Sequence, residues 1–114
     1  MDAPIAVIET PEFLAATRKL LSEEERASLV DHLACNPTAG DLIPGAGGVR
    51  KLRWALEGRG KRGGARVIYY FHSPRLPLLA LDAYAKNEKS NLSPAEKNEL
   101  RQMAKLMAER YGKP

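Results

Sequence analysis

The residues of this chain that could do chemistry are concentrated in one basic segment, residues 49–66. The segment holds seven bases and a single acid, Glu57, so its local charge is +6, whereas the whole chain carries only +4. The bases are Arg50, Lys51, Arg53, Arg59, Lys61, Arg62 and Arg66. A basic stripe in an otherwise mildly acidic protein indicates a polyanionic partner, and nucleic acid is the commonest polyanion.

Other residue types offer little chemistry. His32, His72 and Cys35 form no metal-ligand spacing, and the sequence shows no Ser-His-Asp or paired-carboxylate motif. We therefore expect no metal and no cofactor. RNA cleavage by the substrate's own 2′-hydroxyl needs neither, but it needs a proton acceptor, cations beside the phosphorane and an acid for the leaving oxygen. Clustered lysines can move protons because neighbouring positive charge lowers their pKa, and arginine stays charged.

The length of 114 residues suits one domain, residues 1–114, and no apolar run reaches the ~20 residues of a membrane span. The first residues lack the features of a secretory signal, so we expect a cytoplasmic protein. The lone Cys35 lies in an apolar-periodic segment, which predicts a buried thiol. The two histidines are expected to be structural or surface residues.

Local signals predict the elements that must position the bases. A β-prone stretch covers residues 5–8, and helices are expected to start after Thr10, with Pro11 at the first position, and after the capping boxes at Ser22 and Ser93. Asn36 and the following proline end the second helix. The last helix buries Leu100, Met103, Met107 and Tyr111. Three strand-like runs cover residues 49–56, 65–72 and 76–84, and the Pro/Gly-rich residues 37–48 are expected to form a loop.

This order, β-α-α-β-β-β-α, predicts a small α+β domain with an antiparallel sheet and helices packed on one face. Strand alternation sorts the bases. Leu52, Trp54 and Leu56 are expected to face the core, and so is Arg50, which therefore drops out of the candidate site. Lys51, Arg53, Arg66 and Tyr70 are expected to share the opposite surface, with Arg59, Lys61 and Arg62 in a glycine-rich hairpin loop beside it. Such crowding of like charges predicts a bound phosphate, although a solvated charged face is the simpler alternative.

Two blocks of sequence resemble the RelE/ParE superfamily of type II toxins, and in particular its HigB-like branch. One is Gly47–Arg53 together with Gly60–Phe71, which contains the run GKRGGARVIYYF, and the other is Tyr84–Ser93. The order of elements agrees with this resemblance across nearly the whole chain, which implies a RelE-like fold.

The resemblance implies a ribosome-dependent mRNA endonuclease that enters the ribosomal A site, cuts mRNA by 2′-hydroxyl attack and so inhibits translation. It also implies a cognate helix-turn-helix antitoxin, through whose complex alone the toxin would meet operator DNA. The candidate catalytic residues are Lys51, Lys61, Arg66, Tyr70, Tyr84 and Lys86. Arg53, Arg59 and Arg62 are the candidate RNA-binding residues.

Among these candidates, Arg66 is expected to stabilise the phosphorane and Lys51 or Lys61 to handle protons, while Tyr70 or Tyr84 orients the substrate. Glu88 is assigned to a turn after the last strand and not to the catalytic set. Two other functions stay open. One is a ParE-like toxin that poisons DNA gyrase without nuclease activity, and the other is an RNA-binding module without catalysis.

Overall fold

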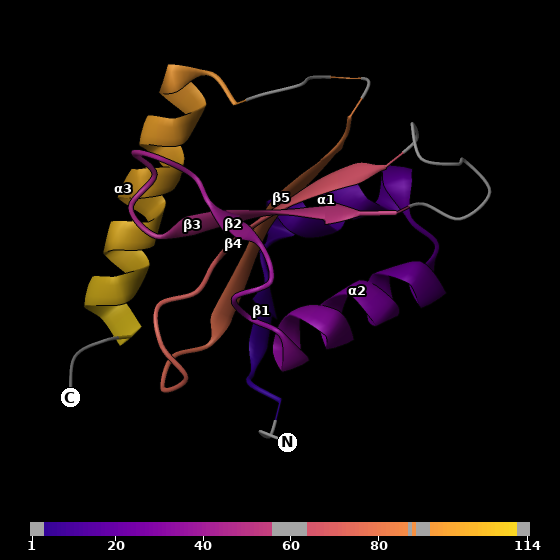
Figure 1. The fold of residues 1–114 in the computed structure, drawn as a ribbon, viewed down its shortest axis with the longest axis horizontal. Helices are drawn as coiled ribbons and strands as arrows, with labels where there is room; N and C mark the ends of the chain where they lie inside the picture. Colours follow the sequence, from indigo (N-terminus) through magenta and orange to yellow (C-terminus); the bar gives the residue numbers. More distant parts are fainter. Residues whose placement is uncertain (1–3, 56–63, 87, 89–91, 112–114) are drawn as a thin grey trace.

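The computed structural model of the protein describes residues 4–55, 64–86, 88 and 92–111 (Figure 1). Five strands and three helices are present in this part of the chain. In chain order they are β1 (Val7–Glu9), α1 (Pro11–Leu20), α2 (Glu23–Cys35), β2 (Asp41–Leu42), β3 (Val49–Trp54), β4 (Ala65–Tyr70), β5 (Leu78–Ala85) and α3 (Pro94–Tyr111). The predicted α+β class is confirmed.

The strands form one sheet in the order β1-β5-β4-β3-β2. β2 to β5 pair antiparallel, but β1 runs parallel to β5, so the sheet is mixed and not antiparallel throughout as expected. Parallel pairing is possible here because α1 and α2 carry the chain back between β1 and the later strands. The expectation that residues 37–48 form a loop was also partly wrong, since Asp41 and Leu42 form β2, which pairs with β3 at the edge of the sheet.

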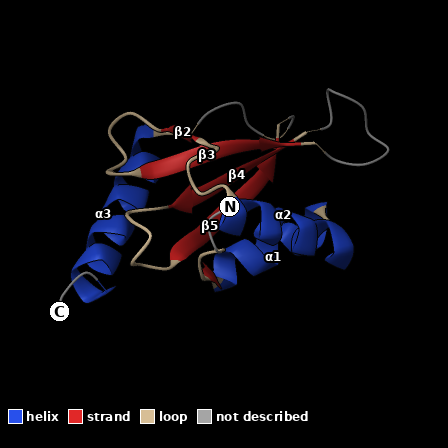
Figure 2. Cartoon of the chain, turned by 60° about the horizontal axis from the view of Figure 1, so that its bottom comes forward, coloured by secondary structure: helices blue, strands red, loops and turns tan. Residues whose placement is uncertain are grey.

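The central strand β4 divides the interior into two cores. Val67 and Tyr69 pack with Phe13 of α1 and Leu29 of α2 on one face. Ile68 and Tyr70 pack on the opposite face, against residues of α3 that include Leu100, Met103, Ala104 and Met107. Helices therefore cover both faces of the sheet, as Figure 2 shows, and the expectation of helices on one face was wrong. In β4 the residues from Val67 to Tyr70 are apolar or aromatic on both faces, which is the pattern of a strand buried on two faces.

The helix starts follow the predicted caps. The Thr10 hydroxyl accepts a hydrogen bond from the Phe13 amide at 3.2 Å and donates one to the Ala80 carbonyl at 2.9 Å, so the α1 cap also ties this helix to β5. Ser22 and Ser93 form reciprocal capping boxes with the glutamates three residues later. Each box satisfies backbone N–H groups that the first helical turn leaves without partners.

A hydrogen-bonded network fixes the chain before β2 against the sheet. The Tyr69 hydroxyl donates to the Pro37 carbonyl and accepts from the Gly40 amide, both at 2.8 Å. Arg50, which lies opposite Tyr69 on β3, donates to the Gly40 carbonyl at 2.8 Å. Arg50 thus faces the α1/α2 side as expected and has a structural contact there. Burial, partly offset by the Gly40 hydrogen bond, raises the pKa of Tyr69.

The glycines before β3 allow a close approach to β4. Gly48 has a φ of 100°, and a Cβ on this residue would lie 3.0 Å from the ring of Tyr70. Only glycine adopts this conformation without strain and leaves room for the ring. Gly48 thus lets the chain before β3 pack closely against β4.

Some local expectations fail or lie outside the described residues. The Cys35 thiol is exposed, because Cys35 is the last residue of α2 and the apolar stripe ends at Leu33 and Ala34. Leu56 and the side chain of Tyr111 lie outside the described part. In that part, no helix is both long and apolar enough to span a membrane.

Replacing Tyr69 by phenylalanine should lower the free energy of unfolding by ~1–3 kcal/mol, because the Gly40 amide would lose its buried acceptor. Urea denaturation of both proteins measures this difference. Tyr70→Phe is the matched control, since its hydroxyl makes no hydrogen bond within the described residues, and it should cost clearly less. Equal losses in the two variants would contradict the role given to the network.

The raised pKa of Tyr69 also predicts how stability depends on pH. The folded state keeps the Tyr69 proton at a pH where the unfolded chain, with the ordinary value of 10.0, has lost it. The stability of the wild type should therefore fall as the pH rises through about 10, and this contribution should be missing in Tyr69→Phe. Urea titrations between neutral and alkaline pH test the difference in slope.

Candidate nucleic-acid interface

The sheet register places two arginines and a tyrosine in one row across three strands. Arg53 of β3 lies directly opposite Arg66 of β4, and Arg66 lies directly opposite Tyr84 of β5. Directly opposed residues of antiparallel strands have Cα atoms ~4.5–5.5 Å apart. The row therefore holds two like charges side by side on one face, next to an aromatic ring.

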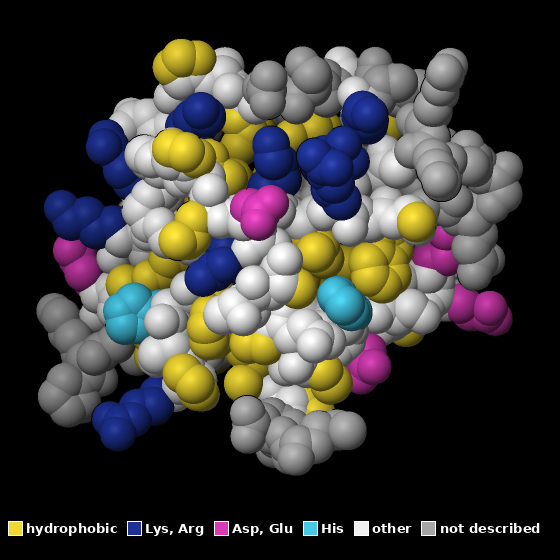
Figure 3. Space-filling view, in the orientation of Figure 1, with side chains coloured by type: hydrophobic (Ala, Val, Ile, Leu, Met, Phe, Trp, Pro, Cys, Tyr) yellow, Lys and Arg dark blue, Asp and Glu magenta, His cyan; other side chains and the backbone are white. Residues whose placement is uncertain are grey.

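Lys51 extends the row along β3. It lies two residues before Arg53 and pairs with Ile68, so it shares the face that α3 partly covers. The rise per residue puts Lys51 ~7 Å from Arg53 along the strand. On the space-filling surface, lysine and arginine side chains gather over this part of the sheet, around an acidic group (Figure 3). The predicted grouping of Lys51, Arg53 and Arg66 on one surface is confirmed.

These three cations have no counter-ion among the described residues. The ion pairs found in that part of the chain belong to Arg26, with Glu9 and Glu23. Arg66 makes only a long 3.4 Å hydrogen bond to the neighbouring Ala65 carbonyl. Arg53 is exposed, and Lys51 and Arg66 are half-buried. Charges with this exposure and this crowding attract an anion from solution.

The two candidate tyrosines have different surroundings. Tyr84 stands at the end of the arginine row and is 4% exposed. Tyr70 lies four residues beyond Arg66, ~13 Å along β4, where α3 and Gly48 enclose it. Its exposure is 5%, and burial raises its pKa. The structure therefore brings Tyr84, but not Tyr70, next to the paired arginines.

Lys86 follows β5 and has an exposed side chain. Its amide donates to the Gly64 carbonyl at 3.0 Å, which joins the end of β5 to the start of β4 beside the arginine row. Glu88 donates its amide to the Ala85 carbonyl in the turn that was predicted for it. The loop candidates Arg59, Lys61 and Arg62 lie outside the described residues.

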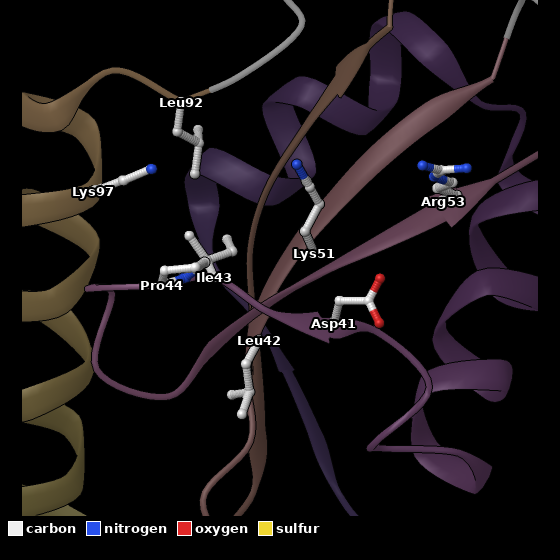
Figure 4. Close-up of a pocket in the computed structure, with 8 residues that line it drawn as sticks. All are labelled: Asp41, Leu42, Ile43, Pro44, Lys51, Arg53, Leu92 and Lys97. Carbon is white, nitrogen blue, oxygen red and sulfur yellow. The ribbon is translucent and has the colours of Figure 1, made fainter.

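Sequence reasoning missed Lys97 and Asp41. Together with Lys51 and Arg53 they line a cavity of about 320 Å³ between β2, β3 and the start of α3 (Figure 4). Lys97 is on the first turn of α3, and Asp41 lies opposite Lys51 on β2. No sequence signal connects either residue to the basic segment, because both arrive through contacts between distant elements.

The two histidines each lie near an aromatic ring. The His32 ring lies 5.5 Å from Trp54 and the His72 ring 6.4 Å from Tyr70, between ring centroids. No group of three or more potential metal ligands occurs among the described residues. The described face presents two arginines and a lysine, which are cations of the kind that can hold a phosphate.

The described residues form a small α+β domain that presents a cationic row on paired strands, with no ion pair to that row among them. The chain matches the family described as "RelE toxin of RelE / RelB toxin-antitoxin system" over residues 7–113. It belongs to this RelE toxin family, and it is a toxin of a toxin-antitoxin system with an antitoxin as its partner. The closer assignment to the HigB-like branch stays a prediction.

Removing one charge of the arginine pair should stabilise the free protein. Arg53→Gln is expected to raise the free energy of unfolding by ~0.2–1 kcal/mol at low salt, because like charges directly opposite each other repel. This gain in stability should shrink at ~1 M salt, because the Debye length there is ~3 Å and the repulsion between the arginines is screened. Urea denaturation at both salt concentrations measures it.

Arg75→Gln is the control for this prediction. Arg75 is an exposed arginine in the turn before β5, outside the row. Its removal should change stability little at either salt concentration. A salt-independent effect of Arg53→Gln, or an equal effect of Arg75→Gln, would contradict repulsion within the row.

Proposed function

We propose that this toxin is a ribosome-dependent endoribonuclease that cleaves mRNA and so inhibits translation. The observation that supports this best is the row of Arg53, Arg66 and Tyr84 beside Lys51. It offers a place for one phosphate, cations to stabilise added negative charge and an amine that can carry a proton. Membership of the RelE family agrees with this activity.

The proposed reaction uses the substrate's own nucleophile. A base removes the proton of a ribose 2′-hydroxyl, and the oxygen attacks the adjacent phosphorus to form a pentacoordinate phosphorane. The bond from phosphorus to the 5′-oxygen of the next nucleotide then breaks, and an acid protonates that oxygen. The products are a 2′,3′-cyclic phosphate and a 5′-hydroxyl. Negative charge develops on the oxygens of the phosphorane, and fixed cations stabilise this charge more than the charge of the unreacted phosphate.

The geometry supports a division of roles. Arg66 is central in the row, so we assign it to the phosphorane, while Arg53 holds a flanking phosphate. Lys51 handles protons from the same face, with Lys61 of the hairpin loop as the other proposed proton carrier. Tyr84 packs beside Arg66 and orients the substrate, and exposed Lys86 extends the positive surface.

One candidate residue drops out of the proposed site, and two others are kept. Tyr70 is left out because it lies four residues beyond Arg66, ~13 Å along β4, whereas Tyr84 is directly opposite Arg66. Arg59 and Arg62 stay proposed RNA-binding residues on the strength of the resemblance, since they lie outside the described part. The catalytic set thus rests chiefly on side chains that rigid strands position.

The ribosome and the antitoxin complete the proposal. We assign the ribosomal A site to this toxin because it presents mRNA as a single strand whose sugar and phosphate are accessible. The antitoxin is proposed to be a helix-turn-helix protein with an acidic or amphipathic segment that covers the basic face or displaces α3 from it. Such a segment would complement the charge of Lys51, Arg53 and Arg66.

Primer extension on translating ribosomes tests the proposed function against its rivals. New mRNA 5′ ends that depend on the toxin would support the endonuclease. Gyrase-linked DNA breaks without mRNA cleavage would instead indicate a ParE-like poison, and ribosome or RNA binding without new ends would indicate a non-catalytic module. Either of these two results would overturn the proposal.

Arg66→Glu should abolish growth arrest and reduce ribosome-dependent cleavage by at least ~100-fold, because the phosphorane would lose its central cation. Arg66→Lys should keep partial activity, since it retains the charge without the planar donor geometry. Growth assays and primer extension measure both effects.

Arg75→Glu makes the same change of charge outside the row and should stay toxic. Antitoxin pull-down and circular dichroism show whether each variant is folded. A folded Arg66→Glu protein that still arrests growth would contradict the role given to Arg66.

A further inference from the structure

Helix α3 carries three cations along one of its faces. Lys97, Arg101 and Lys105 follow each other at intervals of four residues, and residues at this spacing are neighbours on the surface of a helix. The rise of ~1.5 Å per residue separates successive members by ~6 Å and makes the series ~12 Å long. These three residues are called the α3 basic face below.

The α3 basic face meets the arginine row at Lys97. This lysine lines the same cavity as Lys51 and Arg53, and Figure 4 shows its side chain pointing from α3 toward the strands. Lys97 is half-buried, whereas Arg101 and Lys105 are exposed. In Figure 3, lysine and arginine side chains continue from the surface over the sheet to the side where α3 lies in Figure 1. The helix therefore extends the positive surface of the row away from the sheet.

Arg101, in the middle of this face, is held by two local contacts. Its side-chain stem lies against the chain before β3, since a Cβ on Gly47 would be 3.0 Å from the Arg101 Cγ. Its guanidinium donates a hydrogen bond to the Asn98 Oδ1 at 2.6 Å. This bond uses one of several N–H donors, so others are left for a phosphate. An arginine that is already ordered loses less conformational entropy when it binds.

The acids of α3 lie elsewhere on the helix. Glu96 and Glu99 line a cavity beside α1 and β5, and Glu109 lines another cavity, with Leu106 and Arg110. In the part of the chain that the structure describes, no ion pair involves the α3 basic face. A surface helix that serves only solubility commonly alternates the two signs at this spacing, because opposite charges four residues apart stabilise it. The charges of α3 are instead sorted by sign.

This sorting is unfavourable for the free protein. Like charges four residues apart destabilise a helix, and Lys97 stands in the first turn, where the helix dipole opposes a cation. A bound polyanion would relieve both effects. The backbone of a single RNA strand suits the α3 basic face, because its phosphates follow each other at intervals similar to those of the three cations and a positively charged track can follow them.

We propose that the α3 basic face binds the sugar–phosphate backbone of the RNA strand that passes over the arginine row, so that α3 holds this strand on one side of the reacting phosphate. The identity of the strand as the one that is cut rests on the proposed function. The choice of an RNA backbone rests on the position of the three cations. Contacts to phosphates add affinity and do not distinguish bases.

Binding of a 2′-O-methyl oligouridine of about 12 nucleotides tests the proposal, since this strand is unpaired and cannot be cut by 2′-hydroxyl attack. The full-length variant Lys97→Gln/Arg101→Gln/Lys105→Gln should bind it at least ~10-fold more weakly than the wild type at ~0.1 M salt. The slope of log K against log salt should fall in magnitude by ~2, because each phosphate contact to a single strand contributes ~0.7. Fluorescence anisotropy over a range of salt concentrations measures both.

Arg18→Gln/Lys19→Gln/Arg75→Gln is the matched control, because it also removes three exposed positive charges but none of them lies on α3. It should keep most of the affinity and the slope. Circular dichroism during thermal unfolding shows whether each protein is folded, and loss of the α3 charges should not lower the unfolding temperature at low salt. Equal losses of affinity in a folded test variant and the control would overturn the proposal, and so would an unchanged slope in the test variant.

Two further probes distinguish other occupants of the same face. An RNA duplex of similar length tests for structured RNA, such as ribosomal RNA, and antitoxin pull-down tests for an acidic protein segment. If the triple variant loses affinity for the duplex and keeps it for the single strand, the face binds structured RNA and the proposal is wrong. If the variant loses the antitoxin and keeps the single strand, the face belongs to the antitoxin interface, which also overturns the proposal.

Kinetics of cleavage on translating ribosomes separate this inference from the proposed function. The triple variant should raise the KM for mRNA-loaded ribosomes several-fold and leave kcat unchanged, because the α3 basic face lies away from the reacting phosphate. An unchanged KM with normal cleavage would support the nuclease and overturn the role of α3. Strand binding that depends on the α3 basic face, without any mRNA cleavage by the wild type, would support the role of α3 and overturn the nuclease.

Discussion

The alternation of side chains along β4 is the constraint on which the structure depends. β4 is central in the sheet, and each of its faces meets a helical layer, so Val67 and Tyr69 must be apolar for one core while Ile68 and Tyr70 must be apolar for the other. Arg66 is the polar exception in this strand. It lies at the end of β4 that α3 leaves open, where a charged side chain can reach water and any bound anion. The same packing that buries Tyr70 thus defines the position at which a cation is tolerated.

The geometry of the arginine row follows from this pairing of strands. Backbone pairing fixes the spacing between Arg53, Arg66 and Tyr84, so their relative positions do not depend on flexible loops. Repulsion between the two arginines costs little in the free protein because both side chains reach solvent, and it is relieved when a phosphate lies between them. The proposed phosphate would therefore meet cations whose backbone positions are already fixed, which is what electrostatic stabilisation of a phosphorane requires.

Local chemistry explains which features the sequence could predict. The caps at Thr10, Ser22 and Ser93 depend on contacts within one turn, and the two faces of β3 and β4 follow from alternation alone. These signals were enough to group Lys51, Arg53 and Arg66 on one surface. The parallel pairing of β1, the short β2 and the packing of α3 on the second face depend on contacts between distant segments, for which the sequence has no local signal. For that reason Lys97 and Asp41, which reach the site only through α3 and β2, could not be predicted.

A carboxylate beside the cationic row has an electrostatic consequence for the affinity of this face. Asp41 repels every phosphate that approaches Lys51, so it lowers the attraction of this face for RNA of any sequence. The cations compensate for this loss through contacts with the backbone, which carry no sequence information. The net attraction of this face for a polyanion is therefore set by the cations of the row, reduced by the carboxylate beside them.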